Sequence, residues 1–162
     1  MNTLLIVYHS KTGGTRQMVE AAADAARRED VDLVVKAAEE SGSEDILAAD
    51  GYIFAAPENL AAIAGMMKDF YDRTYYDVLA KIEGRPYAQM VCAGTDGENA
   101  ARQTARIAQG WRLKAVAEPL IVCTHADSRE KILSDKTIPK DELDRCAELG
   151  QTLAAGLALG VF

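Results

Sequence analysis

The sequence predicts an α/β fold with three layers, in which a doubly wound, five-stranded parallel sheet lies between two layers of helices. Short apolar segments alternate with longer amphipathic segments five times along the chain. This alternation is typical of parallel sheets whose crossover connections are helices. The apolar segments are hydrophobic at nearly every position, as expected for strands covered on both faces. Pro119 interrupts the last of them and favours a place at the sheet edge, which fits the strand order 2-1-3-4-5.

Five segments are expected to form the strands of this sheet. Each is a short apolar run bounded by glycine, proline or polar residues, which is too short for a helix of its own. They are Thr3–Tyr8, Asp32–Ala37 and residues 51–56, 87–93 and 115–124. Gly13 and Gly14 follow the first strand, and Pro57 is expected to end the third.

The helices are predicted from apolar residues that recur on one face of a 3.6-residue repeat. The expected helices begin near Thr15, near Ser43 (a short one), at 61–75, near Ala100 and at 139–157. Pro139 suits the first turn of the last helix, because an N–H is not needed there. Residues 126–138 form a polar connection for which the sequence predicts no regular element.

Length and composition indicate a single domain over residues 1–162. Hydrophobic residues make up 49% of the chain and charged residues 27%, as in an average globular protein, and no linker or repeat is present. The net charge of −7 repels polyanions, so we expect neither nucleic acid nor an anionic membrane as a partner. No apolar segment approaches the roughly 20 residues of a membrane span.

The cysteines and histidines do not form the patterns of a metal site or a disulfide framework. Cys92, Cys123 and Cys146 are far apart in the sequence, and His9 and His125 have no ligand at metal-binding spacing. Reduced thiols and an N-terminus without a secretory pattern favour a cytoplasmic protein. We therefore expect no bound metal.

The first of three candidate binding loops, residues 9–15, follows the first strand. In sheets of this order, ligands bind beyond the carboxyl ends of the strands, where the first and third strands diverge. The loop carries three hydroxyl groups and two glycines directly before a helix. Backbone amides at a helix N-terminus and Ser or Thr hydroxyls bind phosphate oxygens. The loop is not a P-loop, because Lys11 precedes the glycines; the alternative is an ordinary capped turn.

The second and third loops, residues 57–61 and 93–99, should meet the first at the same edge. In the second, the Asn59 amide and the backbone could bind the edge of a planar ring, with Leu60 against its face. The third is rich in glycine and carries hydroxyl groups. Either could be only a turn, but together with a phosphate loop they indicate a ring-bearing phosphate ligand.

These loops carry a resemblance to a known family. Residues 10–15 (SKTGGT) resemble the S/T-x-T-G-x-T phosphate loop of flavodoxin-like proteins. Residues 56–60 (APENL), followed by Gly65, Lys68, Phe70 and residues 72–74 (DRT), resemble the corresponding stretch of flavodoxin-like NAD(P)H:quinone and FMN reductases. The resemblance covers the whole chain in element order and implies FMN as cofactor, with NADPH or NADH as the electron donor.

The resemblance also implies which residues bind the cofactor. The phosphate would lie on Ser10, Lys11, Thr12, Gly13, Gly14 and Thr15. The ring would lie between Pro57, Glu58, Asn59 and Leu60 on one side and Ala93, Gly94, Thr95, Asp96 and Gly97 on the other. No catalytic acid or base is implied, because the flavin itself carries out the hydride chemistry.

Two functions remain open from the sequence. One is an oxidoreductase that passes electrons from NAD(P)H through FMN to a quinone, a flavin or a similar small acceptor. The other is an electron carrier of the flavodoxin type that serves a redox protein partner. Flavodoxin carriers place aromatic residues on both ring loops, whereas residues 58–61 and 94–97 contain none, which favours the reductase. The resemblance further implies a homodimer or larger assembly, to which Met66, Met67 and Tyr71 could contribute.

Overall fold

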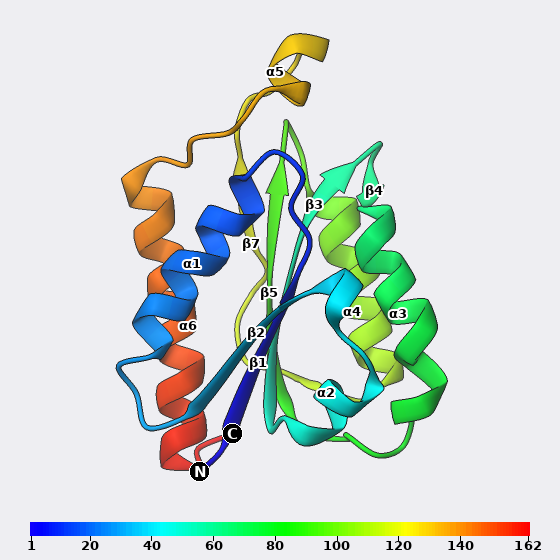
Figure 1. The fold of residues 1–162 in the computed structure, drawn as a ribbon, viewed down its shortest axis with the longest axis vertical. Coiled ribbons are helices and arrows are strands. Elements are labelled where there is room, and N and C mark those ends of the chain that lie inside the picture. The colour runs from blue at the N-terminus through cyan, green and yellow to red at the C-terminus, as the bar shows by residue number, and fades with distance from the viewer.

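The computed structural model describes residues 1–162 and places one sheet between two layers of helices (Figure 1). Strands β1 (Thr3–Tyr8), β2 (Asp32–Ala37), β3 (Gly51–Asn59) and β5 (Pro86–Ala93) are parallel and lie in the order β2-β1-β3-β5. The short strands β6 (Lys114–Ala115) and β7 (Leu120–Cys123) both pair with β5 and complete the edge. The predicted doubly wound fold and its strand order are therefore confirmed.

The fifth strand is shorter than predicted and is divided in two. A continuous strand over residues 115–124 is wrong, because regular pairing stops after Ala115 and resumes at Leu120, opposite Met90. Pro119 stands directly before the second piece. It has no N–H to donate to β5, so the interruption falls where the sequence removes a ladder hydrogen bond.

The helices cover both faces of the sheet, as the sequence predicts. Helices α1 (Gly14–Ala26) and α6 (Lys140–Leu159) lie on one face, and α2 (Ser43–Ala48), α3 (Gly65–Val78) and α4 (Glu98–Gly110) cover the other (Figure 1). A 3-10 turn, Ala38–Glu40, precedes α2. Each face has its own apolar core, and the core beneath α3 and α4 is built on contacts among the rings of Phe54, Tyr71 and Trp111.

The chain after β3 differs from the predicted arrangement. The third strand does not stop at Pro57 but continues to Asn59, turns at Leu60 and Ala61, and pairs back through β4 (Ala62–Ile63). Pro57 lies opposite Cys92 of β5 but beyond the last residue pair of β1 with β3, so β1 needs no donor from it. Consequently α3 starts at Gly65, not at residue 61, and runs to Val78.

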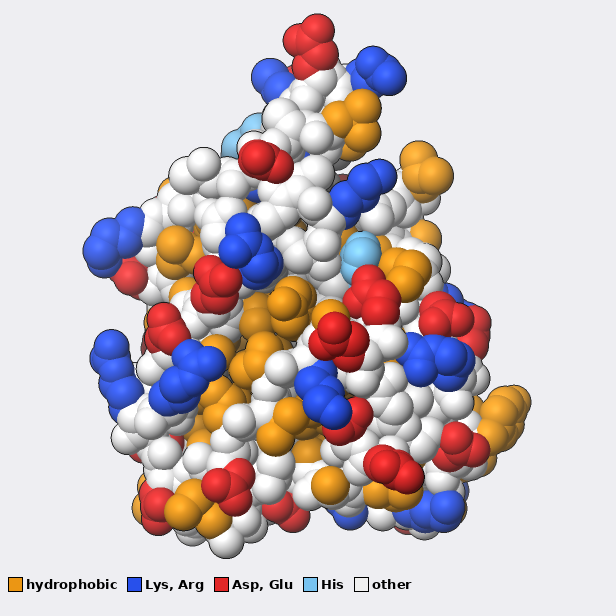
Figure 2. Space-filling model, viewed as in Figure 1, with side chains coloured by type: hydrophobic (Ala, Val, Ile, Leu, Met, Phe, Trp, Pro, Cys, Tyr) orange, Lys and Arg blue, Asp and Glu red, His pale blue; other side chains and the backbone are white.

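The polar connection 126–138 contains a short helix, α5 (Arg129–Leu133), which rises beyond the carboxyl edge of the sheet (Figure 1). The hydroxyl of Ser128 caps it by accepting a hydrogen bond from the Lys131 amide at 3.3 Å. Acidic and basic side chains are mixed across the molecular face in Figure 2. None of the helices combines the length and the apolar character needed to cross a membrane.

Close packing of α1 on α6 depends on Gly150. A Cβ at this position would lie 2.2 Å from the carbonyl oxygen of Ala22, which is backbone and cannot rotate away. We expect Gly150→Ala to lower the free energy of unfolding by about 3 kcal/mol or more, measured by urea denaturation. Gly65→Ala is the control, since nothing lies within 4 Å of its added Cβ. Equal stability of the two variants would contradict this account of the helix contact.

Candidate functional site

A cavity of about 710 Å³ opens where the carboxyl ends of β1, β3 and β5 meet. Its size lies within the range of small-molecule and cofactor sites. Twelve of the fifteen site residues expected from the sequence line it: Ser10, Lys11, Thr12, Gly14, Thr15, Pro57, Glu58, Asn59, Leu60, Ala93, Gly94 and Thr95. The strand order thus brings the three loops to one place.

The other three expected residues lie outside this cavity. Gly13, with φ of 89°, is the N-cap of α1 and borders a smaller pocket on the opposite side of the loop. Gly97, with φ of 90°, is the turn into α4, and a Cβ there would meet Ile121 rather than the cavity. The Asp96 carboxylate accepts a hydrogen bond from the amide of Glu98 at 3.3 Å.

The first loop contains a row of free donors. The backbone N–H groups of residues 11–15 have no acceptor in the protein, whereas the Arg16 amide donates to Ser10 Oγ (3.2 Å) and the Gln17 amide to the Gly13 carbonyl (3.1 Å). The Thr15 hydroxyl is buried and also has no partner. Consecutive free amides at a helix N-terminus, beside an unpaired hydroxyl, suit a phosphate group.

The floor beneath this loop is formed by Cys92. A Cβ on Gly14 would lie only 2.7 Å from Cys92 Sγ, so glycine is required for the loop to lie this close to β5. Burial raises the pKa of the Cys92 thiol to about 11, although the nearby Lys136 ammonium acts in the opposite direction. The thiol therefore stays protonated near neutral pH and serves as an apolar floor, not as a nucleophile.

The second loop is the β3–β4 hairpin, and α4 holds it in place. The Glu58 carboxylate accepts hydrogen bonds from the amides of Gly97 (3.0 Å) and Ala100 (3.5 Å) at the start of α4. The side-chain amide of Asn99 donates to the Ala61 carbonyl (2.5 Å), and Gln103 Oε1 accepts from the backbone amide of Ile63 (2.8 Å). Glu58 is thus a tie between the second and third loops, a role that the sequence pattern did not indicate.

The tip of the hairpin is strained and exposed. Leu60 and Ala61 have φ angles of 51° and 60°, the left-handed region that two-residue hairpin turns require. For a residue with a Cβ, this left-handed conformation costs about 1–2 kcal/mol. The Leu60 side chain is fully exposed at the cavity, and no aromatic side chain lines the cavity from any loop.

A fourth wall, from the connection 124–136, was missed by the sequence analysis. It adds Thr124, Ala126, Ile132, Leu133 and Lys136 to the lining. Two hydrogen bonds dock it on the first loop, from the Lys136 amide to the Thr12 carbonyl (2.8 Å) and from Gln17 Nε2 to the Lys136 carbonyl (2.7 Å). These partners are distant in the chain. The only feature of the sequence that could have indicated this wall was the length of the connection.

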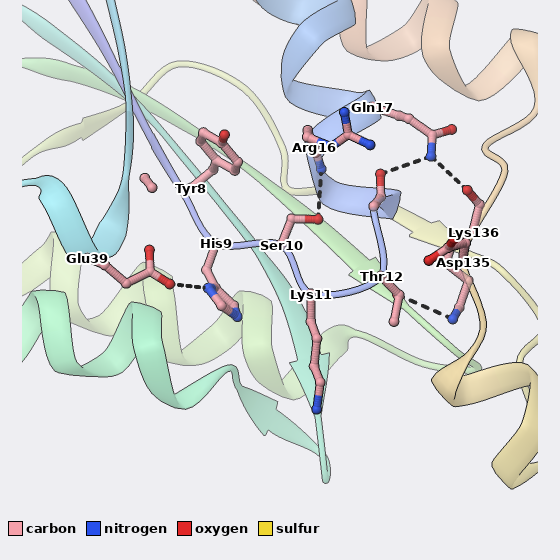
Figure 3. A pocket seen from close by; sticks show the side chains of 12 residues that line it. Tyr8, His9, Ser10, Lys11, Thr12, Arg16, Gln17, Glu39, Asp135 and Lys136 are labelled. Carbon is pink, nitrogen blue, oxygen red and sulfur yellow. Dashed lines mark hydrogen bonds and ion pairs between the residues drawn. The ribbon is translucent and has the colours of Figure 1, made fainter.

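The smaller pocket, about 390 Å³, lies on the other side of the first loop (Figure 3). It is lined mainly by polar side chains and shares Ser10, Lys11, Thr12 and Lys136 with the larger cavity. His9 Nδ1 and the Glu39 carboxylate form a hydrogen-bonded pair at 2.7 Å. The pair ties the first loop to the segment that follows β2.

The site is suited to hold an anion at one end and an apolar ring at the other. Amides and hydroxyls gather at the first loop, whereas the mouth exposes the apolar side chains of Leu60, Ile132 and Leu133. None of the cavity-lining groups is arranged as an acid–base pair.

Comparisons with known proteins agree with this arrangement. A family model described as NADPH-dependent FMN reductase matches residues 35–126. A flavodoxin of Aquifex aeolicus is 34% identical over 86 residues, which cover 52% of this chain and 46% of that protein. An NAD(P)H dehydrogenase (quinone) of Acidithiobacillus ferrooxidans is 33% identical over 95 residues, covering 46% of this chain and 48% of that protein. The matches thus span about half the length of these curated relatives.

The whole fold has solved counterparts. A flavodoxin from the domain Archaea aligns with a TM-score of 0.77 over 96% of this chain and 98% of that chain, at 18% identity. At this identity the likeness shows the fold alone.

Proposed function

The chain belongs to the family of NADPH-dependent FMN reductases, and from this premise we propose that it transfers hydride from NADPH or NADH through FMN to a quinone, a flavin or a similar small acceptor. The family and the flavodoxin relative support FMN as the cofactor. The reductase relative, an NAD(P)H dehydrogenase (quinone), supports the choice of donor and acceptor.

The residues of the cavity fit FMN. The free amides of residues 11–15 and the unpaired Thr15 hydroxyl offer donors to a phosphate, and the lack of a side chain on Gly14 lets the loop lie against Cys92 of β5. Pro57 to Leu60 would border one side of the ring, and Ala93 to Thr95 the other. We also propose that residues 1–162 act as a single FMN-binding domain, because all seven strands join one sheet.

The observation that carries the enzymatic proposal is the open side of the cavity. Neither ring loop contributes an aromatic side chain, and Leu60 projects fully into solvent at the mouth. A nicotinamide can therefore approach a ring bound between the loops. When bound, FMN supplies the hydride-accepting chemistry, while the protein positions it and controls access. Backbone amides of the second and third loops would stabilise negative charge on the reduced ring.

An electron carrier is the second candidate, since one relative that matches is a flavodoxin. A carrier would need a redox protein partner, whereas a reductase needs only a small acceptor.

An assembly of several copies is a further expectation, but two of the three residues named for it are wrong, because Met67 and Tyr71 are buried in the core of the monomer. Met66 and Tyr76 are the large hydrophobic side chains of α3 that are exposed and remain for such a contact.

A turnover assay tests the proposal. FMN-loaded protein should oxidise NADPH or NADH continuously when a benzoquinone or free FMN is supplied. Protein without FMN should not do so when the benzoquinone is the acceptor. The matched control is the same assay with each acceptor omitted under anaerobic conditions, where oxidation should stop after one equivalent of the bound flavin. Failure of both donors with every small acceptor would favour the carrier.

A further inference from the structure

Lys136 is the cation that the fourth wall brings to the phosphate loop. It lines both the large cavity and the smaller polar pocket, so its side chain lies at the boundary between them. Its Cβ is 3.4 Å from the position that a Cβ on Gly14 would take. The other lysine of the loop region, Lys11, is exposed, and its side chain points away from α1 (Figure 3).

The Lys136 ammonium group is held in position by three acceptors. It donates to the carbonyls of Ile132 (2.9 Å) and Ser134 (2.6 Å), and to the hydroxyl of Thr12 (3.3 Å, Figure 3). The first two carbonyls lie at the C-terminal end of α5, where a cation is favoured. An ammonium group has three protons, so each of its donors has one of these three acceptors.

The backbone of Lys136 is fixed as well. Its amide and its carbonyl are bonded to Thr12 and Gln17, and Gln17 Oε1 also accepts from the Ile138 amide at 3.0 Å. The position of the charge relative to the loop is therefore set before any ligand binds, which reduces the entropy that a ligand must offset.

The charge also determines what Thr12 can do. A hydroxyl has one donor and two acceptor positions, and Lys136 occupies an acceptor position of Thr12. The hydroxyl proton is then free to be donated to an anion in the cavity. Arg16, a further cation near the loop, pairs with Glu20 at 3.3 Å on the exposed face of α1.

We propose that Lys136 supplies the fixed positive charge of the phosphate site and orients the Thr12 hydroxyl toward the phosphate of FMN. The proposal rests on the function proposed above, because it concerns the same cofactor. It gives the connection 126–138 a role in selecting a flavin that carries a phosphate over one that does not.

Binding of two flavins separates a phosphate role from a structural one. FMN and riboflavin share the ring and differ in the phosphate. We expect Lys136→Met to weaken FMN binding about 10- to 100-fold, the range for hydrogen bonds to charged groups, and to leave riboflavin binding unchanged. Both dissociation constants are measured by quenching of flavin fluorescence. Lys131→Met is the matched control, since Lys131 lies on α5 but pairs with Asp127 at 3.1 Å away from the loop.

The salt dependence of flavin binding gives a second measurement, which can be made on the wild-type protein alone. The preference of the wild-type protein for FMN over riboflavin should fall as ionic strength rises, because salt screens the phosphate–ammonium attraction. In Lys136→Met the preference should be smaller and less dependent on salt.

Three results would overturn the assignment. These are an unchanged FMN affinity in Lys136→Met, an equal loss for FMN and riboflavin, or a wild-type preference for FMN that does not respond to salt. If the wild-type protein binds neither flavin, the proposed function itself fails. If it binds FMN and Lys136→Met binds it equally well, only the role of Lys136 fails.

Discussion

Replacing Thr12 and Thr15 together with alanine should weaken FMN binding at least about 100-fold. Each hydroxyl is expected to donate to the phosphate, and a hydrogen bond to a charged group contributes about 1.5–3 kcal/mol. The dissociation constant is measured by fluorescence titration. Thr152→Ala, an exposed threonine on α6, is the control and should bind FMN like the wild type. An unchanged affinity of the double variant would overturn the assignment of the phosphate loop.

Removing the Thr15 hydroxyl should weaken FMN binding but should not destabilise the protein without flavin. The Thr15 hydroxyl is buried without a partner, so Thr15→Val removes an unsatisfied polar atom and keeps the shape. We expect this variant to be as stable as the wild type or more stable by about 1 kcal/mol in urea denaturation, while its affinity for FMN falls. A destabilised variant would mean that the hydroxyl serves the fold rather than the ligand.

An aromatic residue at the hairpin tip should close the open side of the cavity. We expect Leu60→Trp to lower the rate at which NADPH reduces bound FMN about tenfold or more, because the indole would cover the ring face that the nicotinamide must approach. The affinity for FMN should be equal or higher, and chemical reduction with dithionite should be unaffected. Stopped-flow absorbance of the bound flavin gives the rate.

Leu60→Ala is the matched control for the hairpin. It keeps the left-handed backbone at this position and removes side-chain atoms, so reduction by NADPH should be as fast as in the wild type or faster. Equal rates in Leu60→Trp and Leu60→Ala would show that the nicotinamide does not approach past residue 60. In that case the open side of the cavity would no longer support the proposal of a reductase.

The parts of the fold that could be predicted are those whose signal is local. Strands covered on both faces are continuous apolar runs, so Thr3–Tyr8 and Asp32–Ala37 were predicted with their observed bounds. The helix pattern likewise predicted a last helix over 139–157, which corresponds to α6. The strand order followed from the alternation and from Pro119.

The errors arise where tertiary contacts override a local pattern. The first part of the β3–β4 hairpin was predicted as a loop, because proline normally ends a strand. Residues 61–63 were predicted as the start of a helix, because Ile63 continues the apolar spacing of α3. What holds the hairpin instead is its bonding to α4 through Glu58, Asn99 and Gln103, more than thirty residues away. A single sequence gives no indication of such partners.

The candidate site divides in the same way. The three loops were predictable because the topology of the sheet determines where they meet. The wall that carries Lys136 was not, since it depends on hydrogen bonds to Thr12 and Gln17 that cross most of the chain. Glu58 was expected at the ring. It lines the cavity, and its carboxylate is bonded to amides at the start of α4, which the sequence did not indicate.

The most direct test of the account is one anaerobic experiment with FMN-loaded protein, freed of excess flavin and mixed with NADPH and, separately, with NADH. The account predicts that at least one donor bleaches the visible absorbance of the bound flavin directly, and that the Thr12→Ala, Thr15→Ala double variant retains too little FMN to respond. A flavin that stays bound and oxidised with both donors, and is bleached only by dithionite, would contradict the reductase and favour the electron carrier.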